Sequence, residues 1–274
     1  MKLIRQFNPI WSNASIQKQA PNTQRGFSLI ELMIALTIGL ALLMVITTVF
    51  TSSRQAFRVQ EDHARIQESG RFALEIIGRS IKQAGYVNVP FTGSKVSFTG
   101  IAITGTNGAA SAADTISLQY DGVAGDRECT FGTLVTAANV TAGSNIIQAH
   151  FNLDAANAQL QCAGTIAALP AAAGAPPTGS VLLENIEDLQ ILYGVDTTGD
   201  QSANQYVAAP ADWTQVVTAR ICVLARSDKT NIVISTAGTY LDCNGAAVAV
   251  PADRRLRHAF TETFTLRNRV NILP

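Results

Sequence analysis

The chain has 274 residues, 20 basic and 20 acidic side chains, and a formal net charge of zero. Hydrophobic residues make up 47% of it and charged residues only 15%, which indicates either a long uncharged run or an uncharged polar domain. Zero net charge gives no indication of nucleic-acid binding, and the hydrophobic content excludes a globally disordered chain. The charges are also unevenly divided: residues 1–26 hold four bases and no acid, whereas residues 87–274 hold ten bases and fifteen acids.

Residues 27–50 form an apolar run, FSLIELMIALTIGLALLMVITTVF, whose one charged residue is Glu31. As a helix this run would be about 36 Å long, enough to cross a hydrocarbon layer of about 30 Å. It is too long for a removable secretory signal, and no small-residue cleavage site follows it. We therefore predict a membrane-spanning helix, with the basic residues before it on the cytoplasmic side and the rest of the chain outside.

Glu31 stands near the start of this apolar run. A carboxylate there is costly unless it lies close to the membrane interface or is paired with a cation. One interpretation is that Glu31 reaches the lipid headgroups. The other is that it pairs with a cation in an assembled state.

Residues 51–86 continue the helical pattern without a proline. Apolar and small residues recur there every three or four positions, which predicts one buried helix face, and Gly85 offers a stop. Glu61 and Glu75 each precede an arginine by four residues, the favoured order for a helical ion pair. We expect ordinary packing for the histidine on this stripe, which consists of Val59, His63, Ile66, Gly70, Ala73, Ile77, Ile81 and Ala84.

The residues at the start of the apolar run resemble a known processing motif. Arg25-Gly26-Phe27-Ser28-Leu29-Ile30-Glu31 is similar to the motif of type IV prepilins, which a membrane peptidase cuts after the glycine. The resemblance implies cleavage between Gly26 and Phe27, removal of residues 1–26 as a leader, and N-methylation of Phe27. It also implies that Glu31, the fifth mature residue, pairs with the N-terminal amine of a neighbouring subunit.

Residues 52–86 narrow the resemblance to one group of these proteins. They are similar to PilW-type minor pilins, and Thr263–Arg269 carries a weaker similarity. The residues that match are Arg58, Gln60, Glu61, Arg65, Gln67, Glu68, Gly70, Arg71, Phe72, Ala73, Leu74 and Ala84-Gly85-Tyr86.

This resemblance implies a minor pilin that acts in assembly or initiation of a type IV pilus, with the pilus tip as one candidate position. The implied partners are other major and minor pilins, the prepilin peptidase, the inner-membrane assembly platform and a tip adhesin. The subunit would first lie in the inner membrane and later in the filament. Three alternatives stay open: a minor pseudopilin of a type II secretion system, a membrane-anchored enzyme or binding module, and an uncleaved signal-anchored protein.

From residue 87 to residue 274 the pattern changes to alternating apolar residues between glycine-rich turns. Ile116–Tyr120, Leu189–Val195, Val217–Ala225 and Phe260–Leu266 are predicted as antiparallel strands with one face on a core. The apolar stripe of the helix is the expected partner of that face, an α+β arrangement with a pilin-like long N-terminal helix. Loops are expected at 104–114 and 163–180.

The cysteines Cys129, Cys162, Cys222 and Cys243 all follow the apolar run. An even number outside the membrane predicts two disulfides, for which three connectivities exist. Pairing of sequence neighbours, Cys129 with Cys162 and Cys222 with Cys243, closes the shorter loops and is favoured here. Zinc is disfavoured because no C-x-x-C pair occurs.

Catalytic motifs are absent from the sequence, so we expect no enzyme activity and no resident cofactor. The stretch 196–204 places oxygen side chains on alternate residues, as calcium loops do, but lacks the glycine and glutamate positions of an EF-hand. A hairpin turn is the alternative interpretation. The calcium hypothesis involves Asp196, Thr198, Asp200, Ser202 and Asn204. A basic cluster of Arg254, Arg255, Arg257 and His258 is interpreted as a solvated turn before the last strand.

Overall fold

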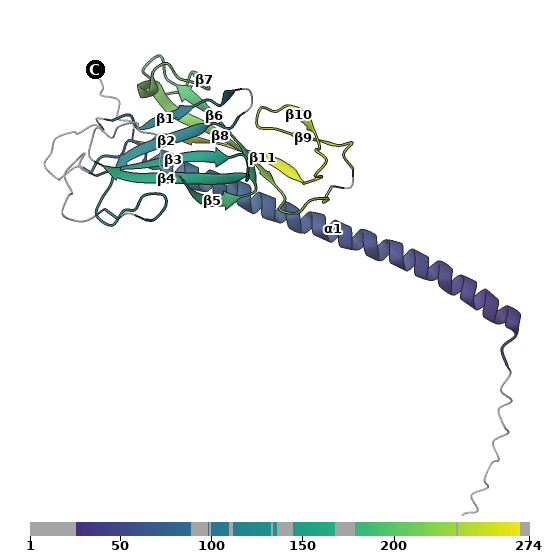
Figure 1. Ribbon diagram of the computed structural model, residues 1–274. Helices are drawn as coiled ribbons and strands as arrows, with labels where there is room; N and C mark the ends of the chain where they lie inside the picture. The colour runs from purple at the N-terminus through teal and green to yellow at the C-terminus, as the bar shows by residue number, and fades with distance from the viewer. Residues whose placement is uncertain are drawn as a thin grey trace, which may run out of the picture. The chain divides into compact units, whose positions relative to one another are not determined.

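The computed structural model describes residues 26–88, 98, 100–109, 112–132, 134–135, 145–167, 179–233 and 235–268 (Figure 1). The predicted leader therefore lies outside the described residues except for its last glycine. The chain divides into two compact units, Met1–Ser53 and Arg54–Pro274. One helix belongs to both, and all strands belong to the second.

Helix α1 runs from Leu29 to Gln83, 55 residues without a break. It ends where the sequence predicts, because Gly85 adopts a φ of +75°, a left-handed conformation that glycine takes without steric cost. The two predicted ion pairs are present and exposed, with Arg65 2.7 Å from Glu61 and Arg79 3.3 Å from Glu75. Exposed pairs of this kind add only a few tenths of a kcal/mol (about 0.3–0.5).

The predicted apolar stripe is confirmed over its C-terminal two-thirds, where α1 packs on the strands. The interpretation of His63 is wrong: its side chain is exposed, with Nδ1 3.1 Å from Nε2 of Gln67. Asp62 is buried instead, with 4% of its surface exposed. Asp62 and Ile66 are one helical turn apart, so the buried line passes through the aspartate rather than the histidine. The buried residues of α1 are Asp62, Ile66, Gly70, Ala73, Leu74, Ile77, Gly78 and Ile81.

Two antiparallel sheets cover this face of α1, which confirms the predicted α+β arrangement. The first sheet has five strands in chain order, each hydrogen-bonded to the next. Its strands are β1 (Ile103–Thr106), β2 (Thr115–Asp121), β3 (Ile146–Asp154), β4 (Gln159–Ala167) and β5 (Ser180–Glu184).

The second sheet has four strands in the order β11-β8-β6-β7, and β9 and β10 form a separate hairpin. A single 3-10 turn, Trp213–Gln215, precedes β8. The strands are β6 (Ile186–Val195), β7 (Gln205–Val207), β8 (Val216–Arg226), β9 (Thr239–Leu241), β10 (Ala247–Ala249) and β11 (Arg257–Thr265).

The four strands predicted from alternation are confirmed as β2, β6, β8 and β11. The two predicted loops are partly wrong, because Thr104–Thr106 belongs to β1 and Ala163–Ala167 to β4. Residues 110–111 and 168–178 of those loops lie outside the described part of the chain. Small and polar residues in both stretches hide the alternation that predicts a strand. The two stretches form strands nonetheless, because their backbones pair with β2 and β3.

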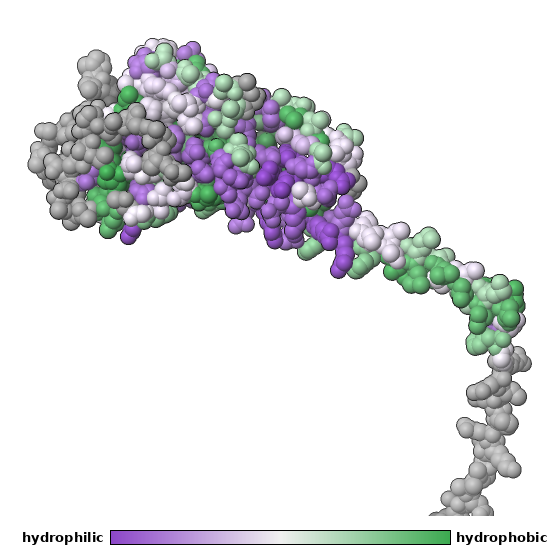
Figure 2. Space-filling view, viewed as in Figure 1, coloured by the Kyte–Doolittle hydropathy of each residue, from purple (hydrophilic) through white to green (hydrophobic). Residues whose placement is uncertain are grey.

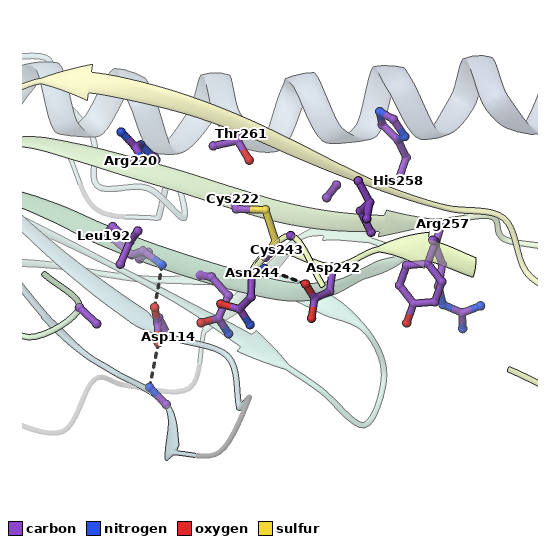
Figure 3. A pocket seen from close by; sticks show the side chains of 18 of the residues that line it. Asp114, Leu192, Arg220, Cys222, Asp242, Cys243, Asn244, Arg257, His258 and Thr261 are labelled. Carbon is purple, nitrogen blue, oxygen red and sulfur yellow. Dashed lines mark hydrogen bonds between the residues drawn. A yellow bond between two sulfur atoms is a disulfide. The ribbon is translucent and has the colours of Figure 1, made fainter. Parts of the chain in front are cut away.

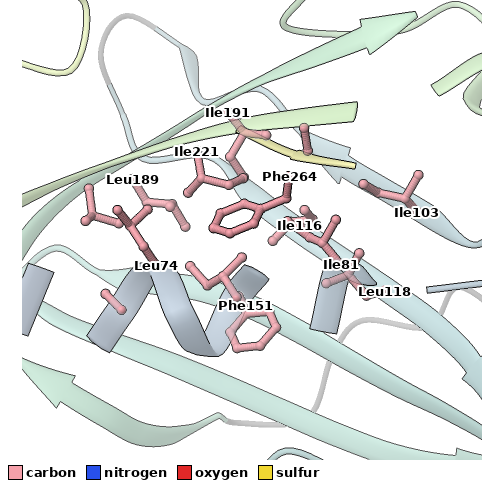
Figure 4. Close-up of a cluster of buried hydrophobic side chains, with 14 of the residues drawn as sticks. Leu74, Ile81, Ile103, Ile116, Leu118, Phe151, Leu189, Ile191, Ile221 and Phe264 are labelled. Carbon is pink, nitrogen blue, oxygen red and sulfur yellow. The ribbon is translucent and has the colours of Figure 1, made fainter. Parts of the chain in front are cut away.

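The hydrophobic core lies where α1 meets both sheets (Figure 4). Leu74 and Ile81 of α1 contact this cluster together with Phe151 from the first sheet. Ile221 and Phe264 come from the second sheet. Each such side chain contributes about 1.5–3 kcal/mol when fully buried, so α1 and the two sheets stabilise one another.

Two glycines let α1 approach β11 closely. A Cβ atom added at Gly70 would lie 2.2 Å from the ring of Phe260, and one added at Gly78 would lie 2.2 Å from the ring of Phe264. Real Cβ atoms do not come that close, so each glycine provides the space for one phenyl ring. These two contacts fix the position of β11 along α1.

Asn268 closes the C-terminal end of α1. Its Nδ2 donates to the carbonyl oxygens of Lys82, Gln83 and Ala84 at 2.9, 3.2 and 3.4 Å. The last carbonyls of a helix have no partner within the helix, so this side chain supplies what α1 lacks. Asn268 lies in the C-terminal segment whose similarity to PilW-type pilins was weak, and its role there is structural.

Candidate functional site

The predicted processing site directly precedes α1. Gly26, Phe27 and Ser28 are exposed and lie outside any helix or strand, and no heavy atom lies within 4 Å of a Cβ built on Gly26. Phe27 is 84% exposed. The bond between Gly26 and Phe27 is therefore free of contacts within the described part of the chain, as a cleavage site needs to be.

Glu31 lies in the first turn of α1, with its side chain exposed. The N-terminal end of a helix carries partial positive charge from its unpaired N–H groups, which stabilises a carboxylate by about 0.3–1 kcal/mol. This contribution is far smaller than the cost of leaving a charge in an apolar layer. In an apolar layer the carboxylate of Glu31 therefore still needs a cation or water beside it.

Within the described part of the chain, no other segment covers the apolar first half of α1. Its large side chains from Leu29 to Phe50 are exposed, and Figure 2 shows the hydrophobic surface that they form. Among the described residues this is the one helix long and apolar enough to cross a membrane. A surface of this size on a free protein marks contact with lipid or with other proteins.

The polar residues within this apolar segment are satisfied inside the helix. The hydroxyls of Thr37, Thr47 and Thr48 donate to carbonyl oxygens three or four residues earlier, at 2.7–2.9 Å. Unpaired polar groups are expensive in a hydrocarbon environment. These threonines are therefore compatible with burial in lipid or between helices, and Glu31 is the exception.

The two favoured disulfides are both present. Cys129 is bonded to Cys162 and Cys222 to Cys243, and no cysteine is free. The first bond ties the β2–β3 connection to β4, and the second ties the segment after β9 to β8. Each closes a long loop, which by chain entropy stabilises the folded state by about 2–4 kcal/mol.

The stretch 196–204 forms the connection between β6 and β7. Asp196 accepts hydrogen bonds from the backbone of Thr198, Gly199 and Gln201 at 3.0, 2.6 and 2.7 Å. Burial opposes the effect, but these donors hold the pKa of the Asp196 carboxyl below its usual value. Asp200 accepts from the backbone of Ser202. Both carboxylates thus organise a turn, as the hairpin interpretation expects.

No group of three His, Cys, Asp or Glu side chains within the described ranges could hold a metal ion. In the same loop, the hydroxyl of Thr197 accepts from Nδ2 of Asn204 at 2.8 Å. The carboxylates of Asp196 and Asp200 and the hydroxyl of Thr198 therefore serve bonds within the loop. Calcium binding stays a prediction without structural support.

The basic cluster before the last strand differs from the solvated turn we expected. Arg257 is the first residue of β11, and only 4% of its side chain is exposed. It bonds Glu187 at 2.6 Å and Asp253 at 2.7 Å. Burial alone would lower the pKa of Arg257, but the hydrogen bonds to both carboxylates outweigh burial and raise this pKa above its usual value. Arg257 therefore belongs to an internal ion-pair network that anchors β11, because a buried guanidinium requires such partners, whereas His258 of the same cluster is exposed.

A polar groove of about 980 Å³ lies on the face of the second sheet opposite α1 (Figure 3). Asp114 closes one side of it, with its carboxylate accepting from the backbone N–H of Gly108 and Ile191 at 2.8 and 2.7 Å. Burial raises the pKa of Asp114, and these two bonds oppose the rise. The disulfide between Cys222 and Cys243 crosses the groove. The charged residues that line the groove mainly hold loops in place.

The comparisons with known proteins agree with the N-terminal motif. Residues 147–268 match the family model for type IV pilus-assembly protein W, and residues 21–47 match the model for the prokaryotic N-terminal methylation motif. Together the two matches support a type IV pilus pilin of the PilW type. The PilW match spans β3 to β11 and includes most of the C-terminal segment that carries the weaker similarity, but it does not include residues 52–86.

A search of solved structures finds a type IV-like pilin from Thermus thermophilus. It is 13% identical to this PilW-type pilin, with a TM-score of 0.48, and the alignment covers 76% of this chain and 98% of that one. No curated protein sequence matches the chain.

Proposed function

We propose that this PilW-type pilin is a minor pilin that acts in the assembly or initiation of a type IV pilus, and that it does so without enzymatic activity. One observation carries the proposal: a methylation motif leads directly into a helix whose first half exposes a continuous apolar surface. Such a surface suits storage in a membrane and later packing against other helices. The match to the model of a pilus-assembly family supports the same role.

The first step is proteolytic processing. The four bases of residues 1–26 favour a cytoplasmic N-terminus and a periplasmic head before assembly. Prepilin peptidase then cleaves between Gly26 and Phe27 and Phe27 becomes N-methylated. Gly26, Phe27 and Ser28 are exposed and lie outside any helix or strand, which supports access to this bond.

The second step is entry into the filament. Glu31 pairs with the N-terminal amine of a neighbouring pilin while the apolar surfaces of the helices pack together. An ion pair at about 4 Å with an effective dielectric constant of about 20 is worth about 4 kcal/mol. Helices in a membrane lack a strong hydrophobic drive toward one another, so this pairing sets their register.

The partners that follow are other pilins, prepilin peptidase and the inner-membrane assembly platform. If the subunit initiates assembly, it lies at the pilus tip, next to an adhesin. The PilW family match supports a pilus over the alternative of a type II secretion pseudopilin. The two readings differ in the machinery that the subunit joins, not in the chemistry of Phe27 and Glu31.

Mass spectrometry of the mature protein tests the proposal. We expect an N-terminus at methylated Phe27, in the membrane fraction and in pili sheared from cells. An N-terminus that retains residues 1–26 would contradict the processing step. Absence of the correctly processed chain from purified pili would contradict the assembly role.

A further inference from the structure

The two main sheets of the described head have four edge strands of unequal length. Three are short: β1 has 4 residues, β7 has 3, and β5 has 5 with a register shift in its pairing with β4. The fourth, β11, has 9 residues and pairs with β8 on one side. Proteins usually keep edge strands short or distorted, because an open edge accepts further strands. The long edge at β11 is therefore the exception.

The pairing register shows which backbone groups of β11 face this edge. Leu266 donates to the carbonyl of Val217, and Ser227 donates to the carbonyl of Leu256. In an antiparallel ladder the bonded residues alternate, so even-numbered residues of β11 bond to β8 and odd-numbered residues point away from it. The outward groups belong to Arg257, Ala259, Thr261, Thr263 and Thr265.

The outward N–H and C=O groups of Ala259, Thr261 and Thr263 have no hydrogen-bond partner within the described part of the chain. Thr261 and Thr263 are exposed, so water reaches them. Threonine also has high strand propensity, and no proline interrupts β11. The edge thus has the backbone groups and the sequence that strand addition requires.

A groove of about 440 Å³ runs beside this edge, between α1 and β11. The contacts of Phe260 with Gly70 and of Phe264 with Gly78 show that even-numbered side chains of β11 face α1. Figure 2 shows hydrophilic surface over the part of α1 that packs on the strands. The lining residues are Arg71, Glu75, Arg79, Lys82 and Glu262.

The groove carries three positive and two negative side chains. Glu75 pairs with Arg79 at 3.3 Å, whereas Arg71 has no ion pair or hydrogen bond among the described residues. The ammonium of Lys82 lies 5.4 Å from the centre of the Phe264 ring. Two cations, Arg71 and Lys82, are therefore available to a partner that carries carboxylates.

We propose that the open edge of β11 binds an extended segment of another protein, which adds a strand to the sheet and places acidic side chains against Arg71 and Lys82. The inference rests on the proposed assembly role, since it supplies the head with a contact surface for a neighbouring pilus component. Backbone hydrogen bonds give the affinity, and the basic wall of the groove selects the acidic side chains.

A second copy of this chain is a poor occupant. Two copies could pair their β11 strands antiparallel, centred on Thr261. The α1 helices of both copies would then line the same groove. Arg71 and Lys82 of one copy would then face the same cations of the other, and like charges in register are unfavourable. A different, acid-bearing segment fits the charges better.

The experiment uses the full-length protein in detergent and a synthetic fluorescent peptide of alternating threonine and glutamate. We expect the peptide to bind at least about tenfold more tightly than a matched threonine–lysine peptide, with affinity that falls as salt is added. Hydrogen exchange of Ala259, Thr261 and Thr263 should slow when the glutamate peptide is bound. Equal binding of the two peptides, or unchanged exchange at these three amides, overturns the proposal.

Thr261→Pro and Thr263→Pro test the edge itself. Proline removes an outward N–H without removing a bond to β8, and edge strands tolerate it. We expect each to weaken peptide binding at least about tenfold, while Thr261→Val, which keeps the N–H, leaves it unchanged. Arg71→Glu should reverse the preference between the two peptides. Wild-type binding by both proline variants contradicts the inference, and hydrogen exchange on the unmutated protein decides the matter if they fail to fold.

The wild-type chain in sheared pili separates this inference from the proposed function. If the wild-type chain is found in pili and the peptides bind without preference, the edge proposal fails and the assembly role stands. If it is absent from pili, the assembly role fails whatever the peptides do.

Discussion

The two halves of α1 show how one helix serves two different environments. From Leu29 to Ser53 almost every side chain is exposed and most are apolar, so this half depends on lipid or other proteins for cover. From Arg54 to Gln83 one face is buried under two sheets of the same chain, and the other face is charged. Helical pattern alone does not distinguish the halves. What distinguishes them is whether the apolar residues surround the helix or lie on one side.

The largest expected effect comes from the one charge in the apolar half. Glu31→Ala removes the carboxylate that we propose pairs with a neighbouring amine, so the amount of this subunit in sheared pili should fall at least about tenfold. Membrane insertion should be unchanged, because the substitution makes the helix more apolar. Quantitative immunoblotting of pili and membranes measures both.

Thr37→Ala is the matched control for that substitution, since it removes a polar group that is already bonded within the helix. It should incorporate at the wild-type level. Normal incorporation of the Glu31 variant would refute the assigned role of the carboxylate.

Two helical glycines sharpen the comparison between the halves. At Gly78 a Cβ atom would meet the Phe264 ring at 2.2 Å, whereas no heavy atom lies within 4 Å of a Cβ at Gly39. Gly78→Ala should destabilise the head by about 1–3 kcal/mol through overpacking. Gly39→Ala should leave the head unchanged and strengthen the helix by up to about 1 kcal/mol.

Thermal unfolding of the detergent-solubilised protein, followed by near-UV circular dichroism, measures the difference. The pair is informative because both substitutions are chemically identical. Equal effects at the two positions would mean that the close contact between α1 and β11 does not exist in solution.

The smallest expected effect concerns the end of the buried half. Asn268→Ala removes the donor that bonds three terminal carbonyls of α1, which should cost about 0.5–2 kcal/mol, the range measured for helix caps. Hydrogen exchange should rise at the last turn near Gln83 before it rises elsewhere in the head. Asn268→Asp keeps the shape but cannot donate, so it should behave like the alanine variant or worse.

Sequence patterns predicted the elements better than their arrangement. The long helix, its end at Gly85, four of the strands and both disulfides follow from residue spacing and turn residues. The division into two sheets does not, because alternation shows that a strand has one buried face and not which strand it pairs with. β4 escaped prediction since residues such as Ala163 and Gly164 give no hydrophobic contrast.

The charged residues were the hardest to place. The sequence shows Arg257 in a basic cluster, and the carboxylate that buries it, Glu187, is 70 positions away. Asp62 and His63 are neighbours, and a helix turn of 100° per residue decides which is buried. By contrast, the roles proposed for Gly26, Phe27 and Glu31 depend on a short motif rather than on tertiary contacts, and they stay predictions.

The contact between α1 and β11 also sets the order in which the head can fold. Phe260 and Phe264 meet glycines that lie 260 − 70 = 190 and 264 − 78 = 186 positions earlier in the chain. Contacts that close such long loops form slowly, because the chain loses much conformational entropy before it gains their energy. Until these contacts form, the apolar face from Ile66 to Ile81 lacks its cover from β11, and apolar surface exposed in a partly folded chain is prone to aggregation.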